Sequence, residues 1–277
     1  MERTFRRAAL AALLCAGCGG DMTDRTPGVT EPQLSSVTPA EWQRLAARRI
    51  FFAHQSVGAN VMDGIAAVLK ANPAIPLHIA EVASAAEMNG PGLYHKKVGT
   101  NGKPETKLAE FDSLSRAAFA DSAAAGVAML KFCYVDVKGQ TDPNLLFEQY
   151  KAEVDALRAA RPGIVIVHVT MPLWVDTGFI DHWGTIALGK ATPIRQLNAA
   201  RHRFNTLMRQ AYGGKEPLFD LAAYEAIGPD GAISDYRYDG ARVPGLAKAW
   251  TTDGGHLNDA AKQRMAEAFL ITLAKLP

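Results

Sequence analysis

The sequence predicts a three-layer α/β/α sandwich around a mainly parallel, five-stranded sheet. Apolar runs with the length of strands alternate with helical patterns from residue 50 onward, and this alternation requires crossover helices that cover a parallel sheet. The runs at 50–53 and 163–169 are almost entirely apolar, as in strands buried on both faces. With 277 residues, 48% of them hydrophobic, the chain can bury one large core.

The first part of the domain shows a helix start followed by strand–helix units. A capping threonine, a first-turn proline and a glutamate that reaches back, all within 38–41, predict a helix over 38–47. The apolar run 50–53 predicts the first strand, and apolar residues at helical spacing predict a helix over 57–69. A second strand is expected over 77–82.

The middle of the chain continues the same alternation. A loop rich in Gly and Asn is expected over 88–103, and the proline that follows it opens a helix over 104–114. The apolar run 127–137 predicts the third strand, and 144–160 has the apolar spacing of a helix. Each helix returns the chain to the edge where the next strand starts.

The last part of the chain completes the sheet and its cover. The run 163–169 predicts the fourth strand, 198–212 a helix and 217–221 a short fifth strand. The final helix is expected over 259–276, with Asn258 as its N-terminal cap. In such sheets functional groups gather beyond the carboxyl ends of the strands, so the loops after the strands are the places to search.

The N-terminus has the pattern of an export signal. Three arginines precede an apolar run at 8–18, which is shorter than the roughly twenty residues that span a bilayer. Residues 13–18, Leu-Leu-Cys-Ala-Gly-Cys, resemble a bacterial lipoprotein lipobox, which implies a signal peptide over 1–17 and a lipid on Cys18. A plain secretory signal cut nearby is the alternative. We expect a flexible tether over 18–37, rich in Gly, Pro, Ser and Thr.

Charge and cysteine content exclude several classes of function. Cleavage before Cys18 removes three Arg and one Glu from 30 basic and 28 acidic residues, which leaves 27 of each and no basic surface for nucleic acid. Cys15 would be removed and Cys18 acylated, which leaves Cys133 without an intramolecular partner, so neither a disulfide framework nor a cysteine zinc site is expected. The histidines lack metal-ligand spacing, and we expect no metal and no cofactor.

Two of the loops hold residues that suit nucleophilic catalysis. Ser56 ends the first strand–helix turn, where the next helix offers backbone N–H groups to a developing oxyanion. His256, three residues after Asp253, is a base whose tautomer the carboxylate can hold. Gly254 and Gly255 between them allow a tight turn. The alternative is that Ser56 merely caps the helix and that Asp253 and His256 are ordinary loop residues.

The segments at 50–60 (IFFAHQSVGAN) and 253–258 (DGGHLN) resemble the first and last blocks of the SGNH (GDSL-type) hydrolases. The resemblance spans about 49–276 and implies a flavodoxin-like sheet. It also implies an ester-cleaving serine enzyme with the triad Ser56, Asp253 and His256. The oxyanion hole would use the N–H groups of Ser56 and Gly102, with Gly99 as the second choice for the glycine.

The sequence departs from the family pattern in two places. His54-Gln55-Ser56 stands where the family has Gly-Asp-Ser, and Val135 stands where the family has the asparagine of the oxyanion hole. A valine side chain cannot donate a hydrogen bond, and loss of such a donor costs roughly 10²–10³ in rate unless another group replaces it. The candidate replacements are the side-chain amides of Gln55, Asn60 and Asn101.

These observations together predict an exported, lipid-anchored serine esterase with its domain over 38–277. We expect the substrate to be an O-acyl or O-acetyl ester on a carbohydrate, with Trp174 and Trp183 as an aromatic wall and His54 within reach of substrate. An acyltransferase with the same triad and a catalytically silent glycan-binding protein are the alternatives. A lipase or thioesterase is a third.

Overall fold

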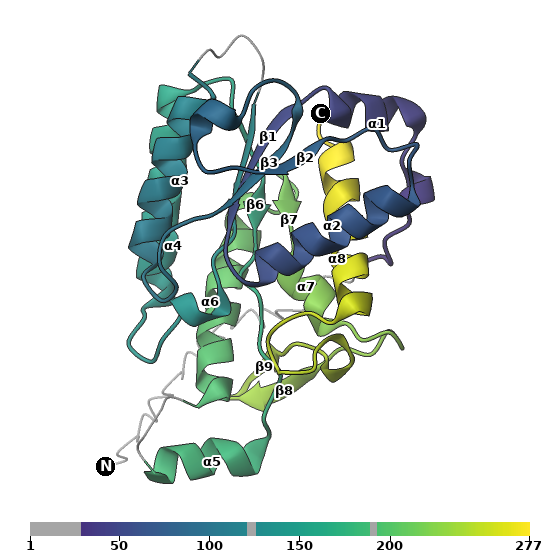
Figure 1. Ribbon diagram of the computed structural model, residues 1–277. Coiled ribbons are helices and arrows are strands. Elements are labelled where there is room, and N and C mark those ends of the chain that lie inside the picture. The colour runs from purple at the N-terminus through teal and green to yellow at the C-terminus, as the bar shows by residue number, and fades with distance from the viewer. Residues whose placement is uncertain (1–28, 121–125, 189–192) are drawn as a thin grey trace, which may run out of the picture.

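The computed structural model describes residues 29–120, 126–188 and 193–277 (Figure 1). The expected signal peptide and the lipidation site at Cys18 lie outside these residues. Five parallel strands form one sheet in the order β2-β3-β1-β4-β5, which gives the α/β/α fold that the sequence predicts. The strands are β1 (Arg49–His54), β2 (Ile79–Glu81), β3 (Gly92–Lys97), β4 (Val127–Leu130) and β5 (Val165–Ile166).

The strand expected over 163–169 is divided in two, and its second part pairs with one further strand in a two-stranded sheet. Its second part, β6 (His168–Val169), pairs in parallel with β7 (Leu218–Phe219), whereas β5 pairs with β4. Because β5 and β6 follow each other directly in one segment, the order read through both is β3-β1-β4-β5/β6-β7 when the short edge strand β2 is set aside. This matches the flavodoxin-like order 2-1-3-4-5, in which β3 takes the place of strand 2.

Three segments differ from the sequence prediction. Strand β3 lies inside the expected loop 88–103. Pairing with β1 holds this segment extended, and its His and Lys residues give it no apolar pattern from which a strand could be predicted. The third strand, expected over 127–137, ends at Leu130, and its remainder is irregular apart from a 3₁₀ turn. A hairpin, β8 (Asp235–Tyr238) and β9 (Ala241–Pro244), occupies part of the expected loop after Ser234, and the Asp-Gly pair between its strands adopts positive φ.

The helices form two layers, one on each face of the sheet (Figure 1). Helix α2 packs against α8, with α1 and α7 beside α8, and α4 packs against both α3 and α6. None of the described helices is long and apolar enough to cross a membrane. The helices are α1 (Pro39–Ala46), α2 (Val57–Ala71), α3 (Pro104–Ala118), α4 (Pro143–Ala160), α5 (Phe179–Leu188), α6 (Ile194–Tyr212), α7 (Leu221–Ala226) and α8 (Asp259–Ala274).

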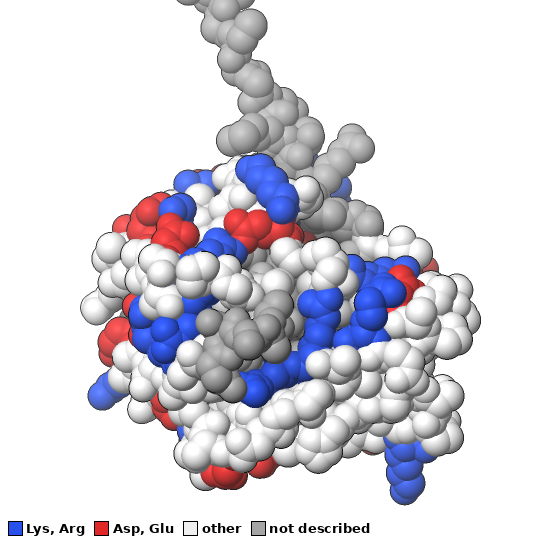
Figure 2. All heavy atoms as spheres, turned by 90° about the horizontal axis from the view of Figure 1, so that it is seen from above, with Lys and Arg blue, Asp and Glu red and all other residues white. Residues whose placement is uncertain are grey.

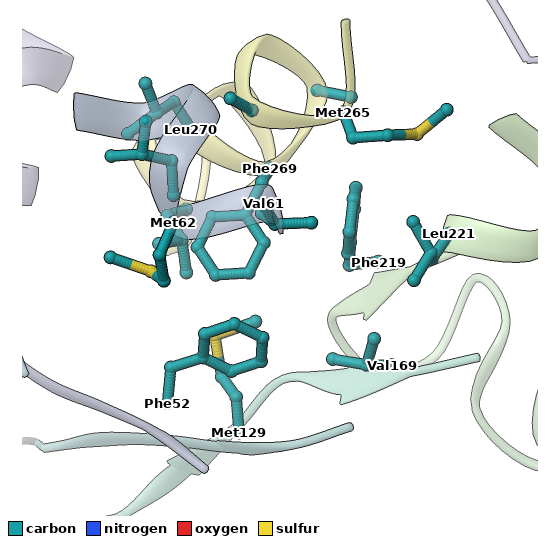
Figure 3. Packing of buried hydrophobic residues seen from close by; sticks show 14 of the residues in the cluster. Phe52, Val61, Met62, Met129, Val169, Phe219, Leu221, Met265, Phe269 and Leu270 are labelled. Carbon is teal, nitrogen blue, oxygen red and sulfur yellow. The ribbon is translucent and has the colours of Figure 1, made fainter. Parts of the chain in front are cut away.

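Strand β1 joins the two halves of the core. Ile50 and Phe52 lie in the cluster under α2 and α8, whereas Phe51 and Ala53 lie in the cluster under α3, α4 and α6, as the alternation of side chains along a strand requires. Phe52 packs against Phe269 of α8 with ring centroids 5.1 Å apart (Figure 3). Packing from both faces fixes the carboxyl end of β1, and with it the turn that follows.

Lys and Arg side chains gather on the face of the molecule that Figure 2 shows. It is the upper end of the view in Figure 1, where β1 begins and α8 ends. Arg49 donates to the carbonyl of Ala118 and Arg161 to that of Arg116, both in the last turn of α3. Arg48 likewise donates to the carbonyls of the last two residues. Cations stabilise the unpaired carbonyls and the negative dipole end of a helix, so this basic face has a structural explanation.

Part of the expected tether packs on the domain. Glu31 forms an ion pair with Arg264 of α8 at 2.9 Å, and Val37 is 6% exposed within the core cluster that contains α8. Leu34 packs against the same cluster. The residues that precede α1 therefore belong to the packed domain from Glu31 onward, because they cover apolar surface on α8.

Candidate active site

Ser56 occupies a strained turn between β1 and α2. Its φ of 47° lies in the region that residues other than glycine rarely adopt, which costs about 1–3 kcal/mol and is common at functional sites. Its side chain makes no capping bond to α2. Instead, Oγ lies 2.7 Å from Nε2 of His256. The capping alternative therefore does not describe this serine.

Asp253 and His256 complete a line of hydrogen bonds to Ser56. Nδ1 of His256 lies 2.6 Å from Oδ2 of Asp253, so the carboxylate accepts the Nδ1 proton. The lone pair of Nε2 then faces the Ser56 hydroxyl, which is the arrangement in which an imidazole removes a proton. The structure brings together the three residues that the sequence predicts as a triad, from loops 200 residues apart in the chain.

The loop itself keeps Asp253 ionised. The N–H groups of Gly255 and His256 donate to Oδ1 of Asp253 at 2.9 and 2.8 Å. These backbone hydrogen bonds, Gly255 first, and then the His256 side chain hold the pKa of Asp253 well below its usual range. A carboxylate that stays charged can stabilise the imidazolium that forms during catalysis.

Trp174 supports the triad loop from one side. The backbone N–H of Val175 donates to the carbonyl of Gly254, and the indole lies against Gly254 and Gly255. A Cβ on Gly255 would lie 2.4 Å from Cζ3 of Trp174, so this position excludes any side chain. Asn198 of α6 holds the Trp174 backbone with two hydrogen bonds, at 3.1 and 2.7 Å.

Tyr134 is a site residue that the sequence reasoning missed. It lies in the segment after β4, and its hydroxyl is 3.4 Å from Nε2 of His256. Its ring meets the Trp174 ring edge-on with centroids 4.8 Å apart. The signal in the sequence is its place beside Val135, in the segment that lines up with the block in which SGNH hydrolases carry an oxyanion-hole asparagine.

The structure corrects the expected role of Gly102. Its N–H donates to Oδ1 of Asp136 at 2.9 Å, so in this conformation the carboxylate already occupies the donor expected to hold an oxyanion. Asp136 also accepts the N–H of Cys133 and the ammonium of Lys107, both at its Oδ2. Asp136 thus ties the loop after β3 to the segment after β4, and the ion pair is completely buried.

The three amides expected to replace the missing asparagine differ in their contacts. Gln55 donates to the carbonyls of Val98 and Gly99, which anchors the loop after β3 and uses both of its amide protons. Asn60 accepts the N–H of Leu257 and so links α2 to the His256 loop. The exposed Asn101 accepts a hydrogen bond from Lys107.

His54 does not lie within reach of substrate, contrary to expectation. It is completely buried, its Nε2 lies 3.0 Å from Nδ1 of His95, and its Nδ1 has no partner. Burial lowers the pKa of His54 to about 2, so the ring is neutral. A Cβ on Gly58 would lie 2.4 Å from Cβ of His54, which shows how closely α2 covers this side chain.

Trp183, the other expected wall residue, lies on α5, which projects at the end of the molecule away from α1 (Figure 1). Its side chain is 52% exposed and its ring contacts His182 edge-on. Trp174 therefore touches the triad loop, whereas Trp183 presents an aromatic face to solvent.

Within the described ranges, His, Cys, Asp and Glu side chains form no group of three or more that could hold a metal ion.

No family model matches the chain, and no curated protein matches its sequence. A Streptococcus pneumoniae structure named as a platelet activating factor has a TM-score of 0.45 and 12% identity over 87% of this chain and 94% of that chain. A Desulfitobacterium hafniense protein named in the G-D-S-L lipolytic family has a TM-score of 0.41 and 9% identity over 81% and 99%. The periplasmic domain of a Salmonella Paratyphi A lipopolysaccharide acetyltransferase has a TM-score of 0.38 and 11% identity over 82% and 85%.

At these TM-scores and identities the likenesses carry no argument about activity. The strand order and the two helical layers define the fold. The case for a reaction rests on the geometry around Ser56.

Proposed function

We propose that the protein is a serine ester hydrolase of the SGNH type. The observation that carries the proposal is the line from Asp253 through His256 to Ser56, with 2.6 and 2.7 Å between the bonded atoms. A second support is the strained backbone of Ser56, which aims the hydroxyl at the imidazole and not at the helix. Strain and a bonded base at one serine are what an activated nucleophile needs.

The reaction proceeds through an acyl-enzyme. His256 takes the proton of Ser56 as Oγ bonds to the ester carbonyl carbon, and the carbonyl π electrons move to the oxygen. The N–H of Ser56 and the positive end of α2 stabilise this oxyanion. The imidazolium then gives its proton to the departing alcohol. Water, deprotonated by the same imidazole, releases the acid and regenerates the serine.

Hydrolysis is favoured over acyl transfer by the exposure of the site. The side chains of His256 and Asp253 are 46% and 52% exposed, so bulk water reaches the base that must activate it. An acyltransferase has to keep water away from its acyl-enzyme. Product analysis with and without a sugar acceptor separates the two reactions, because transfer yields an acylated sugar and hydrolysis yields the free acid.

We propose an O-acyl group on a carbohydrate as the substrate class. Trp174 borders the triad loop and Trp183 exposes half of its surface, and aromatic faces of this kind stack on sugar rings. Trp183→Ala should raise KM for an acetylated oligosaccharide and leave KM for p-nitrophenyl acetate unchanged. Equal KM values for the oligosaccharide in both proteins would remove Trp183 from the site.

We also propose that the protein is exported and anchored by a lipid on Cys18. The support is the sequence alone, in which a basic start and an apolar run precede Leu-Leu-Cys-Ala-Gly-Cys. Mass spectrometry of the mature N-terminus tests this proposal. A diacylglyceryl group on Cys18 is expected, and an unmodified N-terminus after another residue would contradict it.

The activity is tested by hydrolysis of p-nitrophenyl acetate by the purified full chain. Ser56→Ala and His256→Ala should reduce kcat to the background rate, with unchanged circular dichroism. Ser113→Ala is the matched control, because Ser113 is an exposed serine on α3, and it should retain full activity. If the unchanged chain hydrolyses no faster than Ser56→Ala, the esterase proposal fails, and acceptor-dependent transfer and glycan binding become the functions to test.

A further inference from the structure

Three of the groups that the sequence offers near the oxyanion do not serve as donors to it. Val135 cannot donate, and the N–H of Gly102 is bonded to Asp136. Gln55 spends its amide protons on two backbone carbonyls. Ester hydrolysis places a negative charge on the former carbonyl oxygen, and one donor aimed at that charge is worth about 10²–10³ in rate. An efficient esterase therefore needs another donor close to Ser56 that is aimed at this oxygen.

The Tyr134 side chain places a hydroxyl beside the His256 imidazole. Its oxygen lies 3.4 Å from Nε2 of His256, the same nitrogen that lies 2.7 Å from the Ser56 hydroxyl. It comes from the same segment after β4 as Val135, one residue earlier in the chain. The phenol therefore extends from the segment after β4 toward the catalytic side chains, Ser56 and His256.

The surroundings hold the Tyr134 ring in one position. Nε of Arg201, on α6, donates to the Tyr134 carbonyl at 2.9 Å, and the guanidinium lies over the ring at 5.9 Å. Trp174 packs edge-on against the ring, and a Cβ on Gly255 would come within 3.1 Å of it. The residue is 6% exposed. A donor held in this way loses little conformational freedom when the transition state forms.

The protonation state of Tyr134 suits a donor. Burial raises the pKa of its hydroxyl, and this effect exceeds the lowering by the Ser56 hydroxyl. The phenol therefore keeps its proton across the neutral range. It can donate a hydrogen bond without giving up the proton, whereas His256 carries out the proton transfers.

We propose that the Tyr134 hydroxyl is the side-chain donor of the oxyanion hole, in place of the family's asparagine. The proposal rests on the proposed esterase function. Before attack the phenol and the Ser56 hydroxyl both lie against Nε2 of His256. As Oγ bonds to the carbonyl carbon and the Ser56 proton passes to His256, the phenol O–H turns to the new anionic oxygen and stays protonated. Tyr134 forms and breaks no covalent bond.

The test compares Tyr134→Phe with Asn101→Ala in the full chain. Phe keeps the ring contacts and removes only the hydroxyl. Asn101 is the remaining exposed amide of the loop after β3, and its loss tests the rival donor. We expect Tyr134→Phe to lower kcat by about 10²–10³ with little change in KM, and to lower it more than Asn101→Ala does. Ser113→Ala, on the exposed surface of α3, is the control that keeps full activity.

Two readouts separate an oxyanion donor from other roles. The loss of kcat should be the same for p-nitrophenyl acetate and for an alkyl acetate, because both develop the same oxyanion. A loss confined to the alkyl ester would assign Tyr134 to the leaving group and overturn the proposal. The pH profile of kcat/KM should keep its shape in Tyr134→Phe, whereas loss of one limb would make the phenol an acid or base.

The outcomes also distinguish this proposal from the esterase function. If the unchanged chain shows no hydrolysis that depends on Ser56, the esterase function fails and the role of Tyr134 fails with it. If the unchanged chain is active and Tyr134→Phe keeps its kcat, only the role of Tyr134 is refuted. A large loss in Asn101→Ala with full activity in Tyr134→Phe would identify the amide as the donor.

Discussion

Gly255→Ala should damage the site by steric displacement alone. A Cβ at this position would lie 2.4 and 2.5 Å from two ring carbons of Trp174, where carbon atoms normally pack about 3.5–4.0 Å apart. The ring, the loop or both must therefore move by about 1 Å. Gly255 does not have a positive φ, so the backbone conformation itself tolerates alanine and the effect is purely one of packing.

The expected cost is about 1–3 kcal/mol of unfolding free energy, the usual range for an overfilled core site. Because the displaced loop carries Asp253 and His256, we also expect kcat to fall by about 10², as a misplacement near 1 Å can produce. Urea unfolding measures the stability and p-nitrophenyl acetate hydrolysis measures kcat. Gly184→Ala on α5 is the control, because its Cβ would meet nothing within 4 Å. It should lower neither the unfolding free energy nor kcat.

A double-mutant cycle with Trp174→Ala tests the cause. If the indole is what Gly255→Ala strikes, the alanine should cost much less stability once the indole is absent, and the two changes should show a coupling energy of about 0.5–3 kcal/mol. Unchanged stability and kcat in Gly255→Ala, or additive effects in the cycle, would refute the packing described around the triad loop.

Three further predictions concern charged groups. Asp136→Ala should lower the unfolding free energy by about 3–5 kcal/mol, because it strands the buried ammonium of Lys107. The double variant Asp136→Ala/Lys107→Met should lose less stability than Asp136→Ala alone, and an equal loss would contradict this cause. Burial raises the pKa of Glu225 to about 8, so between about pH 4.5 and 8 the folded state keeps a proton that the unfolded state releases, and the unfolding free energy should fall as pH rises through this window. Glu225→Gln should abolish that fall, and an unchanged dependence of the unfolding free energy on pH would contradict it. Asp253→Asn should reduce kcat about 10⁴-fold, because the amide favours the wrong His256 tautomer; activity within tenfold of the unchanged chain would exclude this role.

The sequence predicts the layers of the fold well because the central strands are covered on both faces. The runs at 50–53 and 163–169 are apolar for that reason, and the helices between them have clear apolar spacing. Strand β3 escapes prediction because His95, Lys96 and Lys97 lie in it. Pairing with β1 holds this segment extended, and a long-range pairing leaves no periodic signal in a single sequence.

Some residues of the candidate site could be predicted from the sequence and others could not. Asp253 and His256 are visible because their spacing is local, and Ser56 because a strand and a helix flank it. The occupation of the Gly102 N–H could not be foreseen, since Asp136 is 34 residues away and meets it only through the fold. Tyr134 escaped notice because a tyrosine beside an apolar strand end is ordinarily a core residue.

The most direct test of the central claim is covalent labelling of the full chain with a fluorophosphonate, followed by peptide mass spectrometry. Such probes bond to a serine whose proton a base removes. The account predicts one adduct, on Ser56, which His256→Ala prevents while the other serines remain unlabelled in both proteins. An unlabelled Ser56 in the folded chain, or a Ser56 labelled equally fast in His256→Ala, would contradict an activated nucleophile at this site.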